Sequence, residues 1–116
     1  MTLRLTPAML AAAYDLFRIT PPFNRWRLPP SDEVEFGIGR ARTHLAEYEP
    51  GETSEHRIII HETGVGYIYT VMELMAHEMV HLSLADTPHN RVEHGAEFRR
   101  RAAQVCKYHG FDPKRF

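Results

Sequence analysis

Between residues 70 and 82 the chain reads TVMELMAHEMVHL, and this segment predicts an amphipathic helix. Thr70 and Glu73 match a capping box, in which both side chains accept hydrogen bonds from main-chain N–H groups at a helix start. We therefore expect the helix to begin near Thr70, with Glu73 acting in its cap rather than on a metal ligand. The face that packs into the core is predicted by methionines at helical spacing: Met72, Met75 and Met79.

The same segment contains His77-Glu78-Met79-Val80-His81, an H-E-x-x-H motif. The two histidines lie one helical turn apart on one face, so their imidazoles point to the same place. Neutral imidazole nitrogens bind zinc at about 2.0–2.1 Å, a distance that such a pair can reach. Glu78 can contact a metal-bound water without binding the metal, and we expect it to act as a general base. The alternative is a chance string on a core helix with two partly buried histidines.

A catalytic zinc site needs a third protein ligand and an open position for water. The metzincin spacing requires glycine at position 84 and histidine at position 87, where this chain has Leu84 and Thr87, so that class is excluded. We expect His94 to be the third ligand, because it offers an imidazole and the following Gly95 lets the main chain approach closely. The other downstream donors are His89, Glu93 and, as the next candidate, Glu97.

The rest of the chain predicts an α+β fold. Thr6-Pro7 is typical of a helix start, with Thr6 as the N-cap. Alternating apolar residues predict a strand at 34–38, and further strands are expected around 42–49 and 57–61, the last centred on three isoleucines. We expect these segments to form a meander, that is, a small antiparallel sheet of about three strands.

A C-terminal helix is predicted to run to about Tyr108, with Gly110 as its cap. Its buried face is marked by apolar residues at helical spacing: Phe98, Ala102 and Val105. Cys106 is expected on the core side of this helix. The H-E-x-x-H helix and this helix would together hold the metal.

Length and composition place limits on these interpretations. The 116 residues predict one domain spanning residues 1–116, and a net charge of −1 gives no global attraction to nucleic acid or anionic lipid. The single cysteine excludes an internal disulfide and a multi-cysteine zinc cage, and it suits a reducing compartment. Apolar stretches are too short to cross a bilayer, so we expect a cytoplasmic protein.

The motifs at 77–81 and 94–98 resemble the SprT-like zinc metallopeptidase domain, the catalytic domain of the Spartan proteases. The resemblance covers nearly the whole chain, including the order of helix, strands and isoleucine-rich strand before the H-E-x-x-H helix. It implies that His77, His81 and His94 bind Zn²⁺, that Glu78 is the catalytic residue, and that a protein or peptide is the substrate. The sequence has no cysteine-rich zinc ribbon, so the DNA-crosslinked substrates of Spartan are not carried over.

Two other functions stay open at this point. One is a zinc-stabilised binding domain that grips a partner without cleaving it. The other is a DNA-associated protease recruited through the basic run Arg99-Arg100-Arg101, for which we expect at most weak, salt-sensitive nucleic-acid contact.

Two parts of the active site are less defined by sequence. A residue that stabilises the oxyanion is expected, and four candidates offer a donor: Tyr67, Tyr69, Tyr108 and His109. The strand around Ile58–Ile60 is predicted to border the cleft as an edge strand, where an extended substrate could pair with it.

Overall fold

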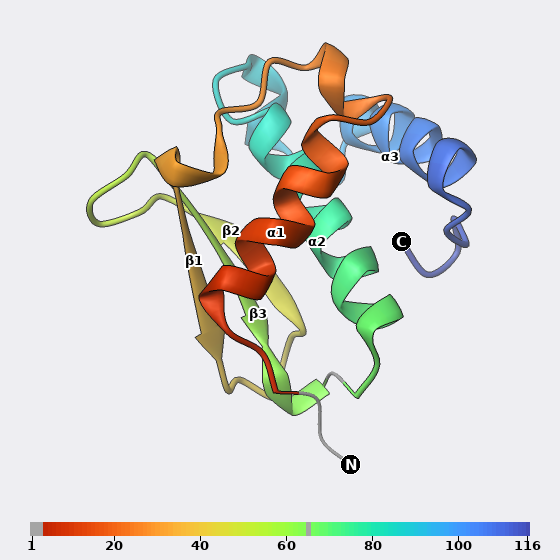
Figure 1. Cartoon of the computed structure of the whole chain (residues 1–116). Helices are drawn as coiled ribbons and strands as arrows, with labels where there is room; N and C mark the ends of the chain where they lie inside the picture. The colour runs from red at the N-terminus through yellow and green to blue at the C-terminus, as the bar shows by residue number, and fades with distance from the viewer. Residues whose placement is uncertain (1–3, 65) are drawn as a thin grey trace.

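The computed structural model describes residues 4–64 and 66–116. Within these residues the elements are α1 (Pro7–Arg18), β1 (Val34–Gly39), β2 (Ala46–Glu49), β3 (His56–His61), α2 (Ile68–Ser83) and α3 (Ala96–His109), joined by short 3₁₀ turns. The α+β class, with an N-terminal helix, a three-stranded sheet and two C-terminal helices, is confirmed. In Figure 1 the sheet lies on one side of the molecule and α3 on the other. None of the described helices is long and apolar enough to cross a membrane.

The first helix begins as its sequence predicts. Thr6 has extended backbone dihedrals, and its side-chain oxygen accepts a hydrogen bond from the main-chain N–H of Met9 at 3.2 Å. This bond satisfies one of the unpaired N–H groups of the first turn. The buried face of α1 consists of Leu10, Ala13, Tyr14 and Phe17.

The order of strands differs from the predicted meander. The sheet has the order β1-β3-β2, with β1 parallel to β3 and β2 antiparallel to it. The expectation of an antiparallel sheet is therefore wrong for β1. The physical reason is burial: Ile58 and Ile60 are fully buried, and the most apolar strand takes the central position, where neighbours cover both of its edges. The expectation that the Ile58–Ile60 strand is an edge strand is wrong for the same reason.

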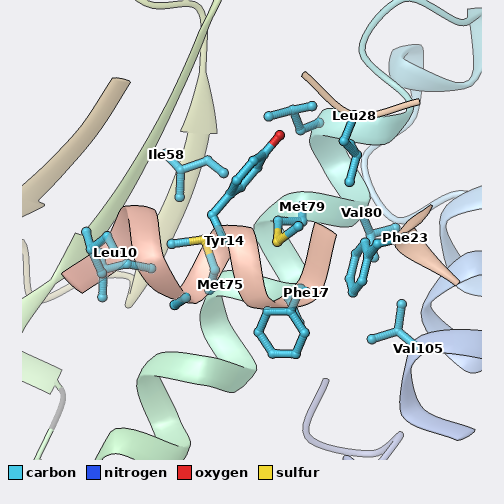
Figure 2. Close-up of a cluster of buried hydrophobic side chains, with 14 of the residues drawn as sticks. Leu10, Tyr14, Phe17, Phe23, Leu28, Ile58, Met75, Met79, Val80 and Val105 are labelled. Atoms are coloured by element: carbon cyan, nitrogen blue, oxygen red, sulfur yellow. The ribbon is translucent and has the colours of Figure 1, made fainter. Parts of the chain in front are cut away.

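The core lies between α1, α2 and the sheet. Figure 2 shows Tyr14 and Phe17 of α1 close to Met75 and Met79 of α2, with Ile58 of the sheet beside them. Met75 and Met79 have no exposed surface, as the helical spacing predicts. Each such side chain contributes about 1.5–3 kcal/mol by leaving water. The core therefore fixes the orientation of α2, whose opposite face carries the histidines.

The start of α2 is not a capping box. The helix begins at Ile68, with Tyr67 at its N-cap and no capping hydrogen bond from a side chain. Glu73 is instead buried and pairs with the guanidinium of Arg115 at 3.2 Å. The capping prediction is wrong because the carboxylate of Glu73, which the local pattern assigns to the cap, pairs with Arg115, a residue distant in the sequence.

The last helix follows its predicted pattern. Phe98, Val105 and Cys106 are buried, and Ala102 is partly buried against the core. Gly110 ends α3 in the left-handed conformation with φ of 79°, the usual role of glycine at a helix C-terminus.

Candidate metal centre

Three imidazoles meet at one point beside α2. His77 and His81 project from neighbouring turns of this helix, and the loop before α3 brings His94 to them. The Nε2 atom of His94 lies 3.2 Å from Nε2 of His77 and 3.2 Å from Nε2 of His81. The structure thus brings together all three residues that the sequence predicts as metal ligands.

The distances between these nitrogens match a metal site. A tetrahedral zinc with bonds of about 2.0–2.1 Å holds its donor atoms about 3.3 Å from one another. The two observed separations of 3.2 Å are close to that value. The three residues therefore fit a single ion bound at one face, with the opposite face open to a further ligand.

The backbone at His94 explains how the loop reaches this point. His94 has φ of 57°, in the left-handed region that few residues other than glycine adopt. Gly95, which we expected to permit the close approach, has φ of −72° and serves as the N-cap of α3. A Cβ at Gly95 would meet the side chain of Val92 at 3.3 Å. The glycine thus makes room for Val92, and the unusual conformation belongs to the histidine.

The hydrogen bond made by Nδ1 of His77 decides which of its two ring nitrogens carries the proton. Nδ1 of His77 lies 2.6 Å from the main-chain oxygen of Phe116, which can only accept a hydrogen bond. Nδ1 therefore carries the proton, and Nε2 keeps its lone pair for a metal.

Burial lowers the pKa of His77. Burial, together with the neighbouring imidazoles of His77 and His94, lowers the pKa of His81 to about 3. Both rings are thus neutral, the form that binds metals.

Glu78 lies in the same site but is not part of the ligand group. Glu78 is 4% exposed, and the three grouped donors are imidazole nitrogens. Burial, reinforced by the carboxylates of Glu93 and Glu47, raises the pKa of Glu78 to about 8. A carboxyl group with a pKa near neutrality is suited to exchange protons with water.

A cavity of about 590 Å³ opens over the imidazoles and Glu78. One wall is formed by Ala46, Glu47 and Tyr48 of strand β2, and another by the loop between α2 and α3. The strand bordering the cavity is therefore β2, an edge strand, and not the central β3.

The four predicted oxyanion residues do not line this cavity. Tyr67 caps α2 and is exposed, and Tyr69 packs against Phe111. Tyr108 receives a hydrogen bond from Arg25 at 3.3 Å, and His109 bonds the main-chain oxygen of Pro21 at 2.9 Å. The donors that line the cavity instead are His44, Tyr48, His89 and Asn90.

The alternative third ligands are placed differently from His94. His89 and Glu93 line the cavity but do not belong to the group of converging donors. Glu97 forms ion pairs with Arg100 and Arg101, the second at 3.1 Å, and these lower the pKa of its carboxyl to about 2. The carboxylate of Glu97 is therefore already paired with arginines of its own helix.

A second group of histidine and glutamate side chains lies at the rim of the cavity. Glu47 accepts hydrogen bonds from Nε2 of His44 at 2.5 Å and of His61 at 2.8 Å. Nδ1 of His61 accepts the N–H of Ala41 at 3.0 Å, so Nε2 carries the proton and has no lone pair for a metal. The separations are those of hydrogen bonds and shorter than donor spacings around zinc. No local sequence pattern predicts this group, because the pairing of β2 with β3 brings His61 to His44 and Glu47.

Comparisons with models of protein families, with curated proteins and with solved structures found no match.

Proposed function

We propose that this chain is a zinc-dependent metallopeptidase of the SprT-like type, in which His77, His81 and His94 bind the ion. One observation carries the proposal. Three imidazole nitrogens converge at the spacing of zinc ligands, on a cavity that is also lined by the buried Glu78. Imidazole donors with an open coordination position are typical of catalytic zinc.

The chemistry follows from what each residue can do. Bound zinc supplies Lewis acidity, which polarises the scissile carbonyl and acidifies water. Glu78 takes the proton of the attacking water and delivers it to the amine nitrogen that leaves. His77 and His81 remain neutral because burial holds their pKa values down.

The edge strand β2 gives a reason to expect an extended peptide as substrate. The N–H of His61 bonds the carbonyl of Leu45 at 2.8 Å, and antiparallel pairs alternate between bonded and non-bonded residues. Ala46 and Tyr48 therefore turn their main-chain groups away from β3, on the side of the strand without a partner among the described residues. A peptide laid along this edge would pair with them beside the metal site.

The structure also bears on the alternatives. A zinc site that only stabilises a binding domain is usually closed by four protein ligands, whereas the converging group here has three donors and faces a cavity. A DNA-associated protease would need cations available for phosphates. Arg100 and Arg101 instead pair with Glu97, and Arg101 also stacks 4.8 Å over Trp26. This supports at most weak, salt-sensitive nucleic-acid contact.

The proposal includes a cytoplasmic location. Its support is Cys106, a free and buried thiol, which suits a reducing compartment.

The test is metal analysis combined with a peptidase assay on an unstructured protein substrate, with and without single-stranded DNA. We expect about one zinc per chain and hydrolysis that stops on chelation. Glu78→Gln should keep the zinc and lose at least about 100-fold in kcat, because the amide cannot accept the proton of water. A Glu78→Gln enzyme that cleaves as fast as the parent would show that Glu78 is not the general base.

A further inference from the structure

The segment that follows α3 folds back onto the metal-binding helix. Asp112 organises a turn, in which its main-chain oxygen accepts the N–H of Arg115 at 3.0 Å and of Phe116 at 3.1 Å. Phe111 is buried, and its ring stacks on that of Phe116 with centroids 5.8 Å apart. We name residues 111–116 the strap.

The strap touches α2 at two points one helical turn apart. Arg115 donates to the carboxylate of Glu73 at 3.2 Å. The main-chain oxygen of Phe116 accepts from Nδ1 of His77 at 2.6 Å, and the two rings lie 5.4 Å apart. The strap therefore contacts the imidazole of His77 directly, through Nδ1, whereas Nε2 faces His94.

Glu73, the partner of Arg115, is a buried residue. Its side chain is 8% exposed, and its second oxygen has no hydrogen-bond partner among the described residues. A buried carboxylate needs a nearby cation to offset its lost hydration, and Arg115 supplies that charge. An exposed ion pair is worth little, but this pair has one partner inside the protein, so breaking it leaves a buried charge.

The hydrogen bond to Phe116 has a chemical consequence for the metal. A free neutral imidazole populates both tautomers and rotates about its side-chain bonds. With Nδ1–H held by an oxygen that only accepts, His77 presents the lone pair of Nε2 toward His94.

We infer that the strap is a positioning element of the metal site: the Phe116 oxygen fixes the tautomer and orientation of His77, and the Arg115–Glu73 pair holds that oxygen in place. This inference rests on the proposed zinc site and deepens it. It makes metal affinity depend on residues that neither bind the metal nor line the cavity over it.

The test measures zinc affinity by competition with a chromophoric chelator. A chain shortened to end at Asp112 should bind zinc about 10–100-fold more weakly, the usual cost of losing such a supporting hydrogen bond. Arg115→Ala should weaken binding by a smaller factor, and Arg115→Lys should restore part of the loss. The matched control is Arg40→Ala, which removes an exposed arginine paired with Glu62 at 2.9 Å and should leave zinc affinity unchanged.

A second measurement separates positioning from loss of structure. In ¹⁵N-resolved imidazole NMR spectra of the metal-free protein, His77 should show a protonated, hydrogen-bonded Nδ1 that disappears in the shortened chain. Unchanged zinc affinity in both the shortened chain and Arg115→Ala would overturn the inference while leaving the metal site intact. If the parent chain binds no zinc, the proposed function fails, and the NMR comparison still decides whether the strap fixes the tautomer of His77.

Discussion

His94 joins an unusual backbone conformation to a metal-binding side chain. A left-handed conformation costs a residue with a side chain about 1–2 kcal/mol relative to the right-handed one. His94 adopts it at φ of 57°, and the result is an Nε2 atom placed between two helical histidines. Backbone strain of this kind is found where function requires a fixed geometry.

Two substitutions separate the strain at His94 from its metal binding. His94→Ala and His94→Gly should both lower zinc affinity sharply, because two ligands do not close the site. In the metal-free state, His94→Gly should be about 1 kcal/mol more stable than His94→Ala, since glycine adopts a positive φ without cost. Chemical unfolding in the presence of a chelator measures this difference. If His94→Ala retains zinc while Glu97→Ala or Glu93→Ala loses it, the site has a carboxylate ligand instead.

Glu97 gives a pH-dependent prediction. Arg100 and Arg101 lower the pKa of Glu97 to about 2, below its unfolded value of about 4.3. A depressed pKa adds stability that is present above pH 4.3 and is lost as the pH falls toward 2. Glu97→Gln should therefore reduce the free energy of unfolding by about 1 kcal/mol near neutral pH. The difference in stability between the parent and this variant should become smaller below pH 4.3. Zinc binding should persist in this variant, and its loss would make Glu97 a ligand.

At the scale of elements, the helices could be predicted from sequence and the strand order could not. Caps, helical spacing and the terminal Gly110 are local signals, and they give α1 and α3 correctly. The start of α2 was misassigned because Arg115, distant in the sequence, competes for Glu73. Strand order depends on which neighbours bury Ile58 and Ile60, and no local pattern contains that information.

The same distinction applies to the site. The pair His77 and His81 follows from helical spacing alone. His94 is predicted from its imidazole, from Gly95 and from the SprT-like resemblance, and the structure gives Gly95 a different role from the one expected. The hydrogen bond from His77 to Phe116 and the group around Glu47 arise from tertiary contacts. These supporting contacts could therefore not be predicted from the sequence.

Strand β2 provides a prediction for substrate binding. Ala46→Pro removes an N–H that points away from β3, so it should preserve the fold and raise KM more than it lowers kcat. Glu47→Pro removes an N–H that faces β3, together with the carboxylate bonded to His44 and His61, and should destabilise the protein by about 1–3 kcal/mol. Peptidase kinetics and thermal unfolding of the two variants make the comparison. An unchanged KM in a folded Ala46→Pro enzyme would exclude strand pairing with substrate at this edge.

At the scale of the whole molecule, a bound ion would link α2 to the loop that leads into α3. The loop follows α2 directly, and its His94 folds back to meet the two imidazoles of that helix. A ligand that binds only the folded state adds to the free energy of unfolding in proportion to the logarithm of its concentration.

Free zinc at about 100 times its Kd should therefore raise the free energy of unfolding by about 2.7 kcal/mol, and chelation should remove this gain. Glu78→Gln should show the same stabilisation by zinc, and His94→Ala should show far less. Denaturant titrations at fixed free zinc measure all three proteins. Equal stability with zinc and with chelator would contradict specific binding to the folded chain.

The strand order has a consequence for how the protein assembles. Strands β1 and β2 each pair with β3 and not with each other, although both precede β3 in the chain. During synthesis neither strand finds its partner until residues 56–61 have followed, and the parallel pairing must close the long loop between β1 and β3. Both pairings therefore depend on the same strand. A weakened β3 weakens both pairings at once, so the wall of the cavity formed by β2 and the contacts of α1 with β1 are affected together.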